Sequence, residues 1–158
     1  MTTIQGIGCQ TYTWEMLGDQ WLGTPTDILD AVSAADYDGV EFSNVMIGDY
    51  FSSPDRFAAD LRQRNLTLAA YAYSTTGFTD AGCFEEDLTG AQKALMFSQE
   101  MGVMLCLGGA SAPSRDQYDV RFDQAIRFYR TVAEQGGRMG VTVKEIAEYL
   151  KLNPATIY

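Results

Sequence analysis

The sequence predicts an α/β fold built from parallel strands. Apolar runs begin near Ile4, Gly39, Leu66 and Val103, and helix-length amphipathic segments separate them. A short run at residues 141–143 starts a fifth unit, which makes about four and a half strand–helix units. This alternation is typical of parallel strands joined by crossovers, with functional residues after the carboxyl ends of the strands. At 158 residues the chain falls short of the roughly 200 that a closed eight-stranded barrel needs, so it is a small open sheet or part of a barrel.

The first unit is expected to be a strand at residues 4–13 followed by a capped helix. Thr24 can cap that helix, Pro25 suits its first position, and Asp27 suits its first turn. Apolar residues at helical spacing continue to Ala35, and residues 39–42 predict the second strand.

The second and third units follow the same order. Ser53 and Pro54 predict the next helix start, and Asn65 is expected to close that helix in a left-handed turn. Residues 66–73 predict the third strand, and their nearly continuous apolar character predicts burial on both faces. Residues 85–101 predict a long helix that ends at Gly102.

The fourth strand is expected at residues 103–107 and the last helix at residues 118–135, ended by Gly136-Gly137. Cys106 lies inside the apolar run and is predicted to be an inert core thiol. An acidic run at the start of the long helix is predicted to be solvated and favoured by the helix dipole; its members are Asp80, Glu85, Glu86 and Asp87.

Composition excludes several classes of function. The net charge of −10 argues against broad binding to nucleic acid or to an anionic membrane. The absence of histidine excludes Ser-His-Asp and Cys-His chemistry within one chain. Three widely spaced cysteines form neither a disulfide framework nor a zinc motif. With no membrane-length apolar run and no signal peptide in the sequence, the expected location is the cytoplasm.

Four segments carry a resemblance to a known family: Ile7-Gly8-Cys9-Gln10-Thr11-Tyr12-Thr13-Trp14, Ala34-Ala35-Asp36-Tyr37-Asp38-Gly39-Val40-Glu41, Gln99-Glu100-Met101-Gly102-Val103 with Gly108-Gly109, and Gln135-Gly136-Gly137-Arg138-Met139-Gly140-Val141. Through them, residues 1–141 resemble the sugar-phosphate isomerase/epimerase family of xylose isomerase-like (β/α)8 barrels. The resemblance implies an incomplete TIM barrel with a short C-terminal helical segment. It also implies a small sugar or polyol substrate and a divalent metal (Mn²⁺, Mg²⁺ or Zn²⁺), held in the family by carboxylates and a histidine that begin around strand five.

The resemblance also suggests site residues. Glu41 would contact substrate or support the metal site; a structural, ion-paired carboxylate is the alternative. Further candidate substrate contacts at strand ends are Gln10, Trp14, Tyr73 and Gly109. Core packing is the alternative for the aromatic residues, with Tyr71 and Tyr73 on one face and Ala72 on the other, and a tight turn is the alternative for Gly109.

The end of the chain has a different character. Glu145 falls near the expected first metal ligand, yet residues 142–158 resemble the opening of an excisionase-type helix-turn-helix. Its first helix would span residues 143–150 and its second would begin at Pro154 and stop after about one turn. The predicted organisation is therefore a partial barrel at 1–141 joined to a helix-turn-helix-like fragment at 142–158, as in a fusion, a chimera or a sequence join.

Three functional hypotheses follow. The chain is a fragment or chimera of a metal-dependent sugar or sugar-phosphate isomerase/epimerase, inactive by itself because the expected metal ligands are missing. Alternatively, it is a structural half-barrel, natural or engineered, that self-associates through its open sheet edges. A third hypothesis is a DNA-binding fusion through residues 142–158, although the acidic chain and the short second helix make nucleic-acid binding an unfavoured expectation.

Overall fold

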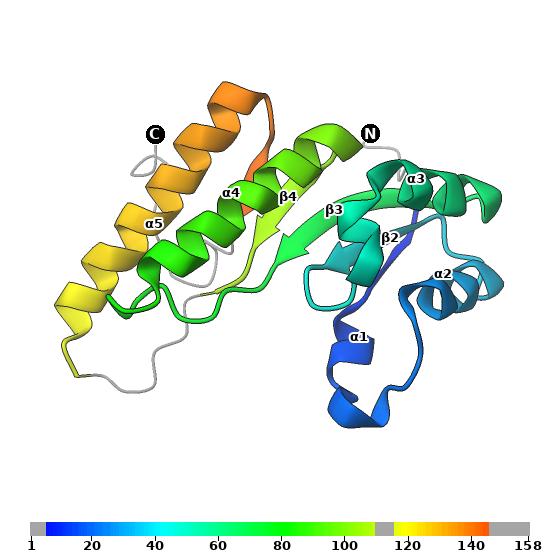
Figure 1. The fold of residues 1–158 in the computed structure, drawn as a ribbon, viewed down its shortest axis with the longest axis horizontal. Helices are drawn as coiled ribbons and strands as arrows, with labels where there is room; N and C mark the ends of the chain where they lie inside the picture. Colours follow the sequence, from blue (N-terminus) through cyan, green and yellow to red (C-terminus); the bar gives the residue numbers. More distant parts are fainter. Residues whose placement is uncertain (1–5, 110–115, 146–158) are drawn as a thin grey trace.

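The computed structural model describes residues 6–109 and 116–145 and has the predicted α/β architecture (Figure 1). One sheet contains five parallel strands in the order of the sequence, as on one side of a (β/α)8 barrel. The strands are β1 (Gly8–Gln10), β2 (Gly39–Ser43), β3 (Thr67–Tyr73), β4 (Met104–Leu107) and β5 (Val143–Glu145). The prediction of a partial barrel is confirmed.

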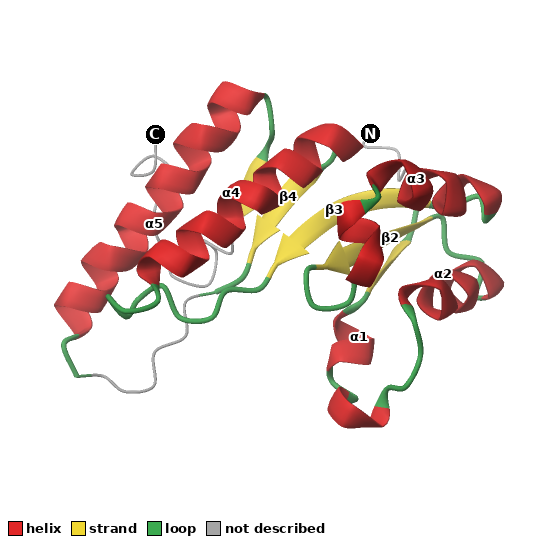
Figure 2. Ribbon diagram, viewed as in Figure 1, coloured by secondary structure: helices red, strands yellow, loops and turns green. Residues whose placement is uncertain are grey.

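Helices connect the strands, and the longer ones pack on one face of the sheet, whereas the short helix that follows β1 lies beyond its edge (Figure 2). The α-helices are α1 (Tyr12–Glu15), α2 (Pro25–Ala34), α3 (Pro54–Gln63), α4 (Phe84–Met101) and α5 (Tyr118–Met139), and two 3-10 helices are η1 (Gly18–Gln20) and η2 (Gly48–Ser52). Among the described residues, no helix is both long and apolar enough to pass through a membrane.

Local sequence signals place several helix ends correctly. The Thr24 hydroxyl accepts from the backbone N–H of Asp27 at 3.4 Å, and the Asp27 carboxylate accepts from the backbone N–H of Thr24 at 2.6 Å. This reciprocal capping box fixes the start of α2. Asn65 follows α3 with a φ of 56°, the predicted left-handed turn. Ser53 precedes Pro54 as predicted, but its side chain makes no capping hydrogen bond.

The first strand is shorter than predicted. Among the described residues of the predicted 4–13 strand, only Gly8–Gln10 pair with β2, and α1 begins at Tyr12. Thr11 is fully buried. Its hydroxyl accepts a hydrogen bond from the backbone N–H of Ser43 at 3.1 Å, and its carbonyl accepts one from the backbone N–H of Trp14 at 3.0 Å. These bonds turn the chain at Thr11, so Trp14 lies in a helix rather than at a strand end.

The last helix is longer than predicted. It runs through Gly136-Gly137 to Met139 and ends at Gly140, which has a φ of 72°. Gly136 lies inside the helix because α5 approaches β5 closely there. A Cβ on Gly136 would lie 2.5 Å from Val143 Cγ2 and 3.0 Å from the carbonyl oxygen of Val141. Gly136 therefore lets α5 pack closely against β5, and Gly140 ends the helix.

The predicted helix at residues 143–150 is wrong at its start. Val143–Glu145 form β5, which pairs with β4 along the sheet. Pairing with a strand edge overrides the local helical spacing, because the backbone groups of β4 need partners on that side. Residues 143–145 thus belong to the sheet, beyond the expected boundary at 141. The rest of the predicted helix-turn-helix lies outside the described residues.

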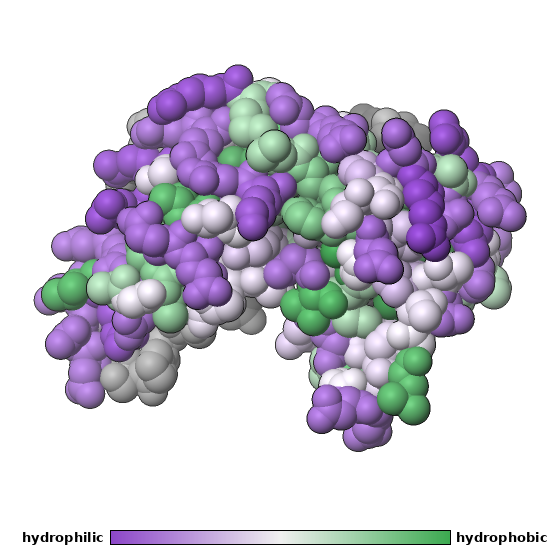
Figure 3. Space-filling model, viewed as in Figure 1, coloured by the Kyte–Doolittle hydropathy of each residue, from purple (hydrophilic) through white to green (hydrophobic). Residues whose placement is uncertain are grey.

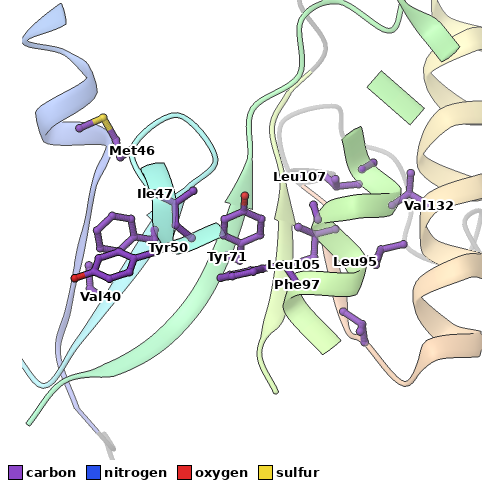
Figure 4. Packing of buried hydrophobic residues seen from close by; sticks show 14 of the residues in the cluster. Val40, Met46, Ile47, Tyr50, Tyr71, Leu95, Phe97, Leu105, Leu107 and Val132 are labelled. Atoms are coloured by element: carbon purple, nitrogen blue, oxygen red, sulfur yellow. The ribbon is translucent and has the colours of Figure 1, made fainter. Parts of the chain in front are cut away.

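The core lies between the sheet and its helices, and it contains most of the large apolar side chains. Figure 4 shows Tyr71 of β3 between side chains of the η2 region, such as Ile47, and of β4, such as Leu105. The opposite face of the sheet is open, because Ala69 and Met104 are exposed. The prediction that β3 is buried on both faces is therefore wrong. Figure 3 shows hydrophilic residues over most of the visible helices, with a hydrophobic patch near the loop between β2 and η2.

Candidate functional site

A hollow lies at the carboxyl ends of the strands, on the open face of the sheet. It encloses about 400 Å³, and its walls come from β1 to β4 and the loops that follow them. Parallel α/β folds place ligands at this position because side chains and loops from several strands converge there. The residues of its walls include Gln10, Glu15, Glu41, Ser74, Thr75, Cys106, Gly108 and Gly109.

Glu41 is the central polar group of the pocket. Its carboxylate accepts a hydrogen bond from the side-chain amide of Gln10, its register partner on β1. The thiol of Cys106, two strands away on β4, donates to the same carboxylate. β3 contributes Ala70 and Ala72 at the register positions between them, and these small side chains leave room for the contact. Glu41 is half-buried, so it remains accessible to a ligand.

Cys106 lies at this pocket rather than in the core. The pKa of its thiol is raised to about 11, first by burial and then by the charge of Glu41 and the hydrogen bond to it, against a smaller opposing effect of Lys144. A protonated thiol at neutral pH is a hydrogen-bond donor and a poor nucleophile. The alternation of strand residues could have indicated its position, because Leu105 and Leu107 on either side face the helices.

Hydrogen bonds join the loops that form the rim. The Asn44 side chain accepts from the backbone N–H of Ser74 at 2.7 Å and donates to the Ser74 carbonyl at 3.4 Å. The Gly108 N–H donates to the Tyr73 carbonyl at 2.8 Å, and the Tyr129 hydroxyl donates to the Gly108 carbonyl at 3.2 Å. A Cβ on Gly108 would lie 3.3 Å from the Ser74 Cα, so glycine permits this approach.

The structure brings together three of the predicted substrate contacts, Gln10, Glu41 and Gly109. Trp14 does not line the pocket; it lies edge-to-face with Trp21 at a centroid distance of 6.3 Å. Tyr73 borders the pocket, but its hydroxyl lies against Gly90 of α4 on the helix-covered side. Tyr71 also lines a hollow on that side and Ala72 lines the pocket, so the predicted alternation is confirmed.

The acidic run at the start of α4 is not uniformly solvated as predicted. Glu85 and Glu86 are exposed, but Asp87 is fully buried. Asp87 accepts three hydrogen bonds from the loop after β3. Glu15, which was not predicted as a site residue, also lines the pocket and accepts a hydrogen bond from the Ser43 hydroxyl. No local pattern marks either contact, because each joins segments that only the fold brings together.

The described residues do not fit a divalent metal. No three His, Cys, Asp or Glu side chains among them gather in a group that could hold one. In the pocket, the Glu41 carboxylate already accepts from an amide and a thiol. Glu145 is the last residue of β5, in register with Leu107 of β4. Its role as a ligand stays a prediction.

Comparison with known proteins identifies the fold. No protein-family model matches the sequence, and no curated protein matches it either. The IolI protein with a bound zinc atom matches with a TM-score of 0.70 and 12% identity over 89% of this chain and 51% of that chain. A D-psicose 3-epimerase from Clostridium cellulolyticum H10, solved with D-tagatose, matches with a TM-score of 0.67 and 13% identity over 88% and 51%. A xylose isomerase-like TIM barrel/4-hydroxyphenylpyruvate dioxygenase fusion protein matches with a TM-score of 0.65 and 17% identity over 91% and 22%.

These matches confirm the fold implied by residues 1–141. The chain has the fold of part of a xylose isomerase-like TIM barrel and spans 22% of the fusion protein and about half of the other two structures. At these identities the likeness concerns the fold alone. None of the reported matches supports the resemblance to an excisionase-type helix-turn-helix.

Proposed function

We propose that this chain is the substrate-positioning half of a sugar isomerase or epimerase barrel, and that its pocket takes a small sugar or polyol. The supporting observation is the pocket at the carboxyl ends of β1–β4, where Glu41 and Gln10 lie together. These groups suit a ligand with many hydroxyl groups. A ligand hydroxyl can donate to the carboxylate, and it can donate to or accept from the amide and hydroxyl groups of the protein. The epimerase of similar fold that was solved with D-tagatose is consistent with this ligand class.

A titration of the chain with D-tagatose, followed by NMR chemical shifts, tests the proposal. Shifts are expected at the ends of β1–β4, with a dissociation constant on the order of millimolar. Glu41→Gln should weaken binding by about tenfold or more, because it removes a charged acceptor worth about 1.5–3 kcal/mol. Glu100→Gln removes an exposed carboxylate on α4 and is the matched control. Equal affinity in all three proteins, or shifts confined to the helices, would contradict the proposal.

We also propose that the chain alone does not catalyse isomerisation and that it acts in the cytoplasm as a fragment or chimera. In this view the complementary half of a barrel supplies the metal ligands that the described residues lack. A purified chain assayed with a ketohexose and Mn²⁺ should give no product above the protein-free background. Robust metal-dependent turnover would refute this part of the proposal.

Self-association is a second candidate function, favoured by the two sheet edges. Within the described residues, β1 and β5 each pair with one neighbour, and their other edges are unpaired. Unpaired edges favour addition of another strand. Sedimentation velocity over a range of concentrations should reveal dimers if two copies complete each other's sheets. A strict monomer at all concentrations would exclude this candidate.

A further inference from the structure

Asp87 stands apart from the other charged residues. Within residues 6–109 and 116–144, it is the only Asp, Glu, Lys or Arg that is fully buried. Burying a carboxylate is costly unless hydrogen bonds or an opposite charge compensate for the lost water. None of the ion pairs among the described residues includes Asp87. Hydrogen bonds therefore have to stabilise it.

All three of these bonds come from the loop that follows β3. One carboxylate oxygen, Oδ1, accepts from the Thr76 backbone N–H at 2.8 Å and from the Thr76 hydroxyl at 3.0 Å. The other, Oδ2, accepts from the Gly77 backbone N–H at 2.8 Å. The first turns of α4 thereby hold two consecutive residues of the loop in place. An aspartate side chain presents an acceptor oxygen to each side of the loop, whereas an asparagine amide would place a donor against one of the N–H groups.

A second anchor holds the other end of the same loop. Asn44, just after β2, is bonded to both backbone groups of Ser74. Ser74 is held by Asn44, Thr75 lies between Ser74 and the residues that Asp87 holds, and both Ser74 and Thr75 line the pocket. The loop is thus fixed from two directions at the place where it forms a wall of the pocket.

We propose that Asp87 is a positioning residue for this pocket. By fixing Thr76 and Gly77, it holds Ser74 and Thr75 as a wall of hydroxyl and backbone groups to which a small sugar or polyol hydrogen-bonds. A loop held in its binding conformation spares the ligand the cost of ordering it. The ligand class rests on the proposed function, whereas the anchoring of the loop does not.

Asp87→Asn tests the proposal, with Glu86→Gln as a matched control that removes an adjacent exposed carboxylate. In the ligand-free protein, Asp87→Asn should speed amide hydrogen exchange at Thr76 and Gly77 about tenfold or more, since one bond to a charged acceptor is lost. It should also weaken D-tagatose binding by about tenfold. Glu86→Gln should change neither. Thr75→Val, which replaces a wall hydroxyl by a methyl group, should weaken binding without altering exchange at Gly77.

The outcomes separate the two parts of the proposal. Unchanged exchange in Asp87→Asn would overturn the anchoring role, whatever the ligand. Faster exchange with unchanged D-tagatose affinity would show a purely structural anchor and overturn the positioning role. Absence of D-tagatose binding to the unmodified chain would reject the ligand class together with the proposed function, while the exchange data still decide the anchoring. If Asp87→Asn does not fold, Thr76→Val removes only the hydroxyl bond and should produce smaller changes in the same directions.

Discussion

The two faces of the sheet carry opposite kinds of side chain. On the helix-covered face, β2 contributes Val40 and Phe42, and β4 contributes Leu105 and Leu107, all fully buried. On the open face, the same strands contribute Glu41 and Cys106, which are half-buried and bonded to each other at the pocket. Neighbouring residues of one strand thus meet different environments because their side chains alternate.

This difference separates stability from binding. The aromatic residues of the covered face contact one another; Phe42 and Phe57, for example, lie edge-to-face at a centroid distance of 5.3 Å. The open face has little apolar side chain to bury, and its polar groups are held by hydrogen bonds across strands. Changes on the first face should therefore alter folding, and changes on the second should alter the pocket.

The largest expected effect comes from adjacent residues of β2. Phe42→Ala should lower the free energy of unfolding by about 3–5 kcal/mol, because it leaves a cavity in the covered core. Glu41→Gln, on the other face of the same strand, should lower it by only about 0.5–1.5 kcal/mol, because it weakens hydrogen bonds across strands and leaves no cavity. Urea denaturation followed by circular dichroism measures both. Similar losses for the two variants would refute the division between the faces.

An intermediate effect is expected where α5 approaches β5. Gly136→Ala should destabilise the protein by about 1–3 kcal/mol, because the added methyl group meets Val143 and the Val141 carbonyl. Gly137→Ala adds the same group where nothing lies within 4 Å. It should stabilise the helix by about 0.5–1 kcal/mol. Thermal denaturation of the two variants should give shifts of opposite sign, and shifts of equal sign would contradict the packing of α5.

A smaller effect is expected at the helix caps of the covering layer. Thr24→Ala should cost about 1 kcal/mol, because it removes the side-chain acceptor of the capping box. Ser53→Ala at the start of α3 should cost much less, because the Ser53 side chain makes no such bond. Chemical denaturation resolves this difference. A larger loss for Ser53→Ala would reverse the assignment of the two caps.

The smallest effect on stability at neutral pH concerns the thiol of the open face. The Cys106 pKa is raised from 9.0 to about 11 in the folded protein, so the unfolded thiol ionises first as the pH rises. The contribution of this thiol to stability is present below about pH 9 and is lost between about pH 9 and 11. Glu41→Gln should lower the Cys106 pKa, because it removes a negative charge and a hydrogen-bond acceptor.

The rate of Cys106 alkylation as a function of pH, followed by peptide mass spectrometry, measures this pKa. Glu15→Gln is the control, because it removes another pocket carboxylate that is bonded to Ser43 rather than to Cys106. An equal shift in both variants, or none in Glu41→Gln, would show that Glu41 does not act on the thiol.

Local sequence signals predicted much of the fold and part of the pocket. Thr24-Pro25-Thr26-Asp27, Asn65 and Gly102 mark element ends through their own backbone preferences, and each lies where it was predicted. Gln10, Glu41 and Gly109 could be placed at one edge because the ends of parallel strands meet there. Trp14 was misplaced because buried Thr11 turns the chain before it.

By itself, the sequence determined the order of strands and helices, since apolar periodicity and helix caps act within a few residues. Tertiary structure decided what lies far apart in the chain: that Gly136 packs on Val143, that the fifth strand runs to Glu145 where a helix was predicted, and that buried Asp87 holds Thr76. Each of these depends on two segments whose contact removes groups from water. The free energy of such a contact is a property of the pair, and neither segment reveals it alone.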